Sequence, residues 1–285
     1  MDLKKFVFPG LAIMLFAFTH NKNSVRITGD DLQNRQAVAG INLTVAEGKR
    51  LIAEGIANHP LVKQKMNAGM IIITKGSTNT YIAERLMGLD APHGSFITGN
   101  ITPASGRGLD LNLAKIAEII LIDGKPAAMT LNEALSRIKE DDIVFKGANL
   151  LNYEKRQAAV CIGSPEGGTT AKVRPYTGKG KGKLIIPVGL EKDVSGDLEG
   201  YVKKLSQDAA QLTMIPRVWI HHEGEVFTEI EALKLFGKVD VIPFAAGGIA
   251  GREGGISLAV CGDSAEVKKV LAVVGIIQGE EPFVK

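Results

Sequence analysis

The sequence predicts an α/β protein with an open parallel sheet, followed by a smaller α+β domain. Short continuous runs of apolar residues recur along the chain, as in strands that are buried on both faces of a parallel sheet. Most of these runs end in a Gly-bearing loop, and helical segments alternate with them. The 285 residues include 33 glycines and only 5% aromatic residues, which fits an aliphatic core with many tight turns. We therefore expect a Rossmann-like core with its ligand crevice at the carboxyl ends of the strands.

The chain divides into three parts on composition. Residues 1–23 contain an apolar stretch over 6–18, which predicts either a buried strand or helix, or an export signal or membrane anchor. This stretch is short for a membrane span, which takes about 20 residues. Residues 24–195 form the expected ligand-binding core. Residues 196–285 form the expected small α+β domain.

The charge balance is nearly even, with 34 basic and 31 acidic residues and a net charge of +3. This balance gives no electrostatic reason to expect a nucleic-acid partner. A cytoplasmic protein is expected, with the alternative that residues 4–18 export it or anchor it in a membrane. Nothing in the sequence fixes a symmetry, so a homo-oligomer is left open.

Strands and helices alternate along the core. Thr44 predicts a helix start, because Glu47 three residues later completes a capping box, and Pro60 marks the end of that helix. Met70 to Thr74 is a continuous apolar run and predicts a strand that is buried on both faces. The expected helices are 44–58, 61–67, 80–87 and 131–140, and the expected strands are 70–74, 116–122, 143–145, 158–162 and 184–188.

After about residue 195 the pattern changes to that of an α+β domain. Residues 217–227 alternate like one antiparallel strand, and they contain the adjacent pair His221 and His222. Neighbouring side chains on a strand point to opposite faces, so no metal site is expected there. The other expected elements are helices over 198–212, 229–236 and 264–274 and strands over 239–244 and 256–260.

The loop after the strand at 70–74 has the composition of an anion cradle. It consists of Lys75, Gly76, Ser77, Thr78, Asn79 and Thr80. A helix N-terminus exposes unpaired N–H groups and the positive end of the helix dipole, and here a lysine and several hydroxyls add to it. The alternative is an ordinary strand-to-helix turn. Neither GxxxxGK[ST] nor GxGxxG occurs, and no cofactor is expected.

Four short segments follow one another along the chain: Gly69–Thr80, Asp142–Asn149, Ile162–Gly168 and Lys183–Val194. They resemble the first strand with its phosphate loop, the strand ending in Gly-Ala-Asp, the Gly-rich third loop and the late strand with its Ser-Lys element of one superfamily. This superfamily includes ribose-5-phosphate isomerase, glucosamine-6-phosphate deaminase, sugar-sensing transcription regulators and CoA transferases. The similarity covers about residues 44–194.

The resemblance implies a site for a phosphorylated or carboxylated small metabolite, and sugar-phosphate isomerase-like chemistry. Glu166 would be the acid/base group and Lys192 would stabilise negative charge. The implied anion and ligand contacts are Lys75, Gly76, Ser77, Thr78, Asn79, Thr80, Gly147, Asn149, Gly163, Ser164 and Gly167. Gly147 and Asn149 would orient a carbonyl or hydroxyl group.

The sequence departs from this superfamily at Asn149, where the isomerases have a carboxylate. An amide cannot abstract a proton from carbon, so the acid/base role would pass to Glu166. Two alternatives stay open: an acyl-CoA transferase in which Glu166 is the nucleophile, and a metabolite sensor or scaffold without turnover. Glu166 as a solvated loop acid is the structural alternative.

A second basic loop precedes the strand at 184–188, with Lys179, Lys181 and Lys183 alternating with glycines. Such a loop either folds over an anionic ligand as a lid or is a solvated connection. Both interpretations stay open at the level of the sequence.

Overall fold

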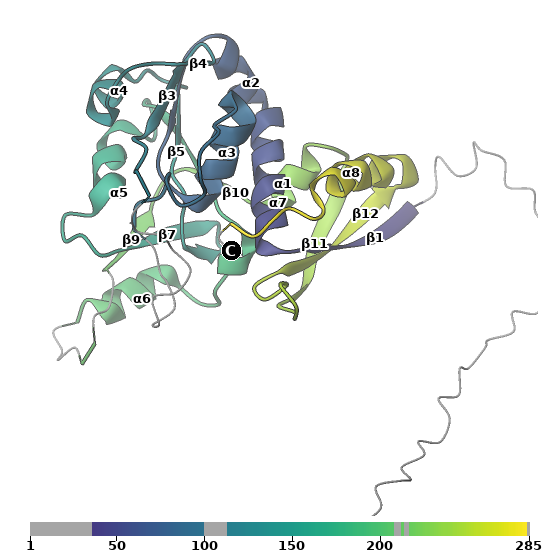
Figure 1. Cartoon of the computed structure of the whole chain (residues 1–285). Coiled ribbons are helices and arrows are strands. Elements are labelled where there is room, and N and C mark those ends of the chain that lie inside the picture. Colours follow the sequence, from purple (N-terminus) through teal and green to yellow (C-terminus); the bar gives the residue numbers. More distant parts are fainter. Residues whose placement is uncertain (1–35, 100–112, 208–211, 214–216, 284–285) are drawn as a thin grey trace, which may run out of the picture.

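The computed structural model describes residues 36–99, 113–207, 212–213 and 217–283. The apolar segment within residues 1–23 lies outside these residues, so its two interpretations stay predictions. In the part that is described, the chain is a mixed α/β structure built on a six-stranded mixed sheet (Figure 1). None of the described helices is both long and apolar enough to cross a membrane.

The central sheet has the strand order β10-β8-β5-β2-β3-β4. Its strands are β2 (Met70–Ile73), β3 (Ile119–Ile122), β4 (Lys125–Pro126), β5 (Ile143–Phe145), β8 (Lys183–Pro187) and β10 (Glu225–Phe227). The first four in the order run parallel, while β3 and β4 are antiparallel to their neighbours. All four residues of β2 are buried, which confirms the expectation of a strand covered on both faces.

The described helices are α1 (Val45–Asn58), α2 (Pro60–Asn67), α3 (Ser77–Met87), α4 (Leu131–Arg137), α5 (Gly168–Val173), α6 (Leu198–Leu205), α7 (Glu229–Lys234) and α8 (Ser264–Ile277). A capping box at Thr44 starts α1, as the sequence predicts. Thr130 and Glu133 form a further capping box at the start of α4. A third capping box, at Thr228, starts α7. The helix expected over 198–212 is shorter, since α6 ends at Leu205.

Two expectations about strands are wrong. The run at 158–162 is a strand, β7 (Gln157–Ile162), but it pairs antiparallel with β6 (Leu150–Asn152) and β9 (Arg217–His221) in a separate sheet. The segment 217–227 is two strands, β9 and β10, which lie in different sheets. Gly224 between them has a φ of 123°, a conformation that residues with a side chain rarely adopt.

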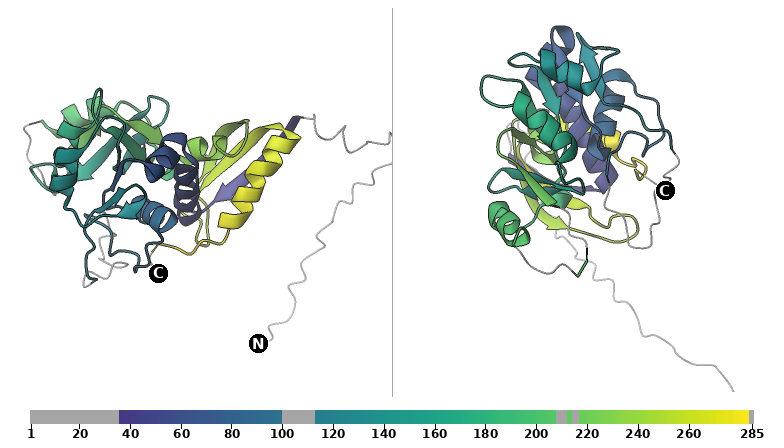
Figure 2. Two further views of the ribbon diagram at one scale, coloured as in Figure 1. Left: turned by 90° about the horizontal axis from the view of Figure 1, so that it is seen from above. Right: turned by 90° about the vertical axis from the view of Figure 1, so that its left-hand side faces the viewer.

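The third sheet has the order β1-β12-β11, built from β1 (Gln36–Leu43), β11 (Val239–Ala246) and β12 (Ile256–Asp263). Both pairings are antiparallel, and α8 packs against β1 and β12. Figures 1 and 2 show this sheet and α8 extending to one side of the body that holds the central sheet. Each of the three described sheets combines strands from both sides of residue 195, the boundary expected from composition.

Helix α1 joins the body that holds the central sheet to the part formed by the third sheet and α8. It packs against α3 and α7 and also contacts α8. Gly55 permits the close approach of α1 to α7. A Cβ at Gly55 would lie 2.5 Å from the Cβ and 2.7 Å from the Cα of Ala232.

We predict that Gly55→Ala destabilises the fold by about 1 kcal/mol net, because overpacking costs ~1–3 kcal/mol and the gain in helix propensity returns only part of it. Gly275→Ala in α8 is the matched control, since a Cβ there meets no described atom within 4 Å. Its expected effect is neutral to stabilising. Urea denaturation of both variants tests this, and equal midpoints would contradict it.

Candidate functional site

A cavity of about 410 Å³ lies at the carboxyl ends of β2, β5 and β8. Parallel strands end at the same edge of a sheet, so the loops that follow them are brought together. Lys75 to Asn79 follow β2, Lys146 to Asn149 follow β5, and Lys192 ends the 3₁₀ turn after β8. The structure therefore gathers most of the first loop, all four residues from Lys146 to Asn149 and Lys192 around one space.

The first loop presents a helix N-terminus to the cavity. Helix α3 starts at Ser77, three residues earlier than expected, and the first backbone hydrogen bond of this turn runs from Thr80 N to Gly76 O. The backbone N–H groups of Ser77, Thr78 and Asn79 lie in the first turn of the helix and have no carbonyl partner within it, so they are available to a ligand. A Cβ at Gly76 would meet only Asn79, at 3.9 Å, so the space in front of the helix is open.

Asn79 and Thr80 stabilise the conformation of this loop through hydrogen bonds. Asn79 is fully buried, and its Nδ2 donates to Thr74 O at 2.8 Å, while Thr74 Oγ1 donates to Phe145 O at 2.8 Å. These bonds tie the end of β2 to the end of β5. Thr80 Oγ1 donates to Gly76 O at 3.0 Å, and Thr80 does not line the cavity.

Asn149 in the second loop is oriented by strand β7. Its Oδ1 accepts a hydrogen bond from Cys161 N at 2.7 Å, and its backbone N donates to Ala159 O at 3.1 Å. Because Oδ1 already accepts this hydrogen bond, the amide Nδ2 is the group of Asn149 that can donate to a ligand in the cavity. Asn149 thus offers a hydrogen-bond donor, which suits a carbonyl or anionic oxygen.

Four lysines line the cavity: Lys49 from α1, Lys75, Lys146 and Lys192. Among the described residues of the wall there is no carboxylate. Burial, and then the charge of Lys192, lowers the pKa of Lys49 to about 8. Burial lowers the pKa of Lys146 to about 8 as well. Crowded, desolvated cations of this kind are stabilised when an anion binds between them.

Two carboxylates lie close behind these lysines. Glu191 forms an ion pair with Lys192. Glu229 is 1% exposed, and its Oε2 accepts from Leu190 N at 2.9 Å. Burial, and then the charge of Glu191, raises the pKa of Glu229 to about 8. The close approach of α1 requires Gly48 here, because a Cβ would lie 2.6 Å from Glu229 Oε1.

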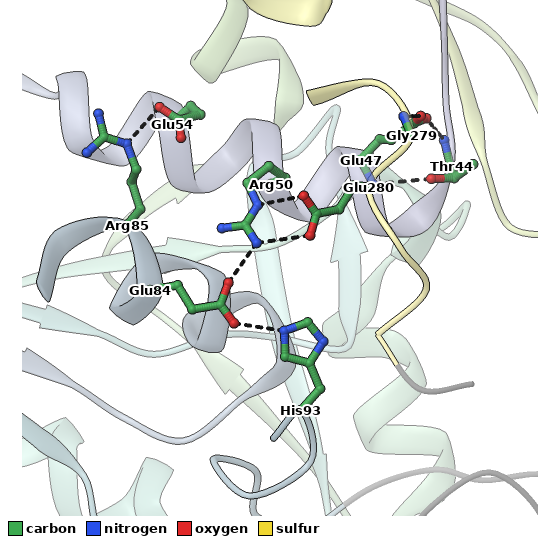
Figure 3. Close-up of polar contacts among 9 residues, drawn as sticks. All are labelled: Thr44, Glu47, Arg50, Glu54, Glu84, Arg85, His93, Gly279 and Glu280. Carbon is green, nitrogen blue, oxygen red and sulfur yellow. Dashed lines mark hydrogen bonds and ion pairs between the residues drawn. The ribbon is translucent and has the colours of Figure 1, made fainter. Parts of the chain in front are cut away.

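The segment after α8 returns to the cavity and places Phe283 in its wall. Figure 3 shows how it is held: Arg50 on α1 binds Glu280 at 2.9 Å and Glu84 at 2.7 Å, and Glu84 also binds His93 at 2.7 Å. The ring of His93 stacks on Phe283 with centroids 4.6 Å apart. A polar network between α1 and α3 thus fixes the last described residues.

Besides Thr80, four of the expected site residues do not line this cavity: Gly163, Ser164, Glu166 and Gly167. They follow β7, which belongs to a different sheet, so its end does not meet the ends of β2 and β5. Glu166 is exposed, and its Oε2 accepts from Ser164 Oγ at 2.9 Å. Gly167 packs under Trp219, where a Cβ would lie 2.6 Å from the ring.

The glycine- and lysine-rich loop lies at the amino end of β8, away from the edge that holds the cavity. Its backbone is bonded to itself and to a neighbour: Gly178 N donates to Gly182 O, and Lys179 N donates to Glu223 Oε2 at 3.0 Å. The loop therefore does not cover this cavity.

Sequence reasoning missed Lys49, Glu229 and Phe283, and assigned no role to Lys146. Lys146 directly precedes Gly147, and that position is a signal that could have identified it. The other three come from helices or a tail whose facing side depends on tertiary contacts.

Comparison with protein-family models, with curated proteins and with solved structures found no match for this chain. The resemblance of the four segments therefore stays a prediction.

Glu229 should make stability depend on pH. Its pKa is raised on folding, so its contribution is present at acidic pH and is lost as pH rises through about 8. Glu229→Gln keeps an acceptor for Leu190 N but has no ionisation to penalise. The free energy of unfolding of wild type should therefore fall relative to this variant between about pH 5 and pH 8. Urea titrations at several pH values test this, and parallel pH profiles would count against it.

Proposed function

We propose that this chain binds a small phosphorylated or carboxylated metabolite in the cavity at the carboxyl ends of β2, β5 and β8, on a Rossmann-like core. The observation that carries the proposal is the convergence of four lysines from separate segments on one cavity that also receives the N-terminus of α3. A wall with this charge and with free backbone donors favours an anion.

In this proposal, different walls of the cavity hold different parts of the ligand. The anionic group lies against the N-terminus of α3, within reach of Lys75 and the hydroxyls of Ser77 and Thr78. The remainder extends toward Gly147 and the amide of Asn149. A volume of about 410 Å³ suits a metabolite of sugar-phosphate size, since ligand pockets take ~300–1,000 Å³.

Sugar-phosphate isomerase-like conversion is the leading reaction class, and it needs a group that accepts a proton from carbon. The described wall offers lysine amines for this role but no carboxylate, and Glu166 lies elsewhere. An acyl-CoA transferase would need a carboxylate at the reacting centre, so the cavity supports this alternative less. A metabolite sensor needs only the binding groups, and it is the second candidate function.

Ribose 5-phosphate should raise the melting temperature of the protein, whereas ribose should not. A ligand at about 100 times its Kd adds about 2.7 kcal/mol of stability. Lys75→Met should weaken binding on the order of tenfold, as expected for a lost charge-assisted hydrogen bond of ~1.5 kcal/mol.

Lys181→Met is the matched control, because Lys181 lies in the loop at the amino end of β8 and does not line this cavity. Isothermal titration calorimetry measures both variants. Equal affinity of Lys75→Met and Lys181→Met would contradict the proposed site. So would equal stabilisation by ribose and by its phosphate.

A further inference from the structure

Lys146 is placed unlike the other lysines of the cavity. It is 9% exposed, follows β5 directly and lines the cavity. Its Nζ has one hydrogen bond among the described residues, a long one of 3.4 Å to Gly147 O. None of the ion pairs of the described residues includes Lys146, so no carboxylate in the described part of the chain balances its charge.

The other cavity lysines have compensation or solvent. Lys192 is paired with Glu191. The charge of Glu191 opposes the effect of burial on Lys49, and Lys49 Nζ lies 5.3 Å from the centroid of the Phe283 ring. Lys75 is only partly buried. Lys146 is therefore the cavity lysine that is buried and also lacks a carboxylate in the described structure.

The surroundings of Lys146 disfavour its protonated form. Burial alone accounts for the lowering of its pKa to about 8. The neighbouring His221 responds to the same crowding, because burial and then the charge of Lys146 lower the pKa of His221 to about 4. A desolvated lysine without a counterion among the described residues is in part neutral near pH 7, and the neutral amine is a nucleophile.

We propose that Lys146 forms an imine with the carbonyl carbon of an anionic aldehyde or ketone bound in this cavity. This rests on the proposed function, since the Lys75–Asn79 loop would hold the anionic group of the same molecule. The proposal names the substrate class as a phosphorylated or carboxylated carbonyl compound, and it makes Lys146 a catalytic residue.

The reaction balances without an oxidant or reductant. Nζ attacks the carbonyl carbon, a C–N bond forms, and the carbonyl oxygen takes up a proton to give a carbinolamine. This hydroxyl then leaves as water, and the C=N bond replaces the C=O bond. The two hydrogens that Nζ loses balance those of the water. The imine nitrogen then takes up a proton from solvent, and the protonated imine withdraws electrons from the adjacent C–H bond, which is the activation that an isomerisation requires.

Reductive trapping tests the proposal. The full chain is incubated with dihydroxyacetone phosphate or with pyruvate in the presence of sodium cyanoborohydride, which reduces an imine to a stable secondary amine. Intact-mass spectrometry should show one adduct, and peptide mapping should place it on Lys146. The two probes distinguish a phosphate anchor from a carboxylate anchor.

Lys146→Arg keeps the positive charge and should lose the adduct, whereas Lys181→Arg, in the loop at the amino end of β8, should keep it. Stabilisation by inorganic phosphate is measured in parallel to separate the two proposals. Stabilisation by phosphate without an adduct on Lys146 would overturn the imine and leave anion binding intact. Absence of both would overturn the two proposals together. Labelling spread over surface lysines in wild type also overturns the imine, and this result does not depend on how the variant folds.

Discussion

The parallel pairing of β2, β5 and β8 is the constraint on which the rest of the structure depends. Because these strands run in the same direction, the loops after Ile73, Phe145 and Pro187 must meet at one edge of the sheet. The loops are then locked by bonds between strand ends, such as Thr74 N to Phe145 O and Lys146 N to Ile185 O, both at 3.1 Å. The cavity is a direct product of strand direction.

The same geometry creates an electrostatic cost. It buries Lys146 and places Lys192 at the same wall, to which α1 adds Lys49, and burial removes much of the hydration of these lysines. Glu191 offsets part of this cost at Lys192 and Lys49, but nothing described offsets it at Lys146. An anion in the cavity would reduce the repulsion, and a neutral Lys146 would avoid it. These two outcomes correspond to the binding and the chemical role proposed above.

Local features of this fold were predictable from sequence, while the partners of some elements were not. The capping box at Thr44 and the apolar strands at 70–74 and 143–145 depend on nearest neighbours, and they were predicted correctly. An apolar run does not specify its partner strand, which is why β7 was assigned to the wrong sheet. That error also carried Glu166 into the expected site.

The sequence predicts the cavity residues that directly follow an expected strand, but not those that come from distant parts of the chain. The residues from Lys75 to Asn79 and Asn149 follow predicted strands, and the structure brings them together. Lys49 depends on which face α1 turns to α7, and Phe283 depends on the ion pair between Arg50 and Glu280. These are contacts between residues far apart in the chain, and no periodicity encodes them.

The central claim is that an anion binds between the N-terminus of α3 and the lysines of the cavity. A crystal structure of the protein soaked with tungstate, a phosphate analogue with a strong anomalous signal, tests this directly. The account predicts an anomalous peak within hydrogen-bond distance of the backbone N–H groups of Ser77 and Thr78. A fully occupied peak elsewhere, with none in this cavity, would contradict it.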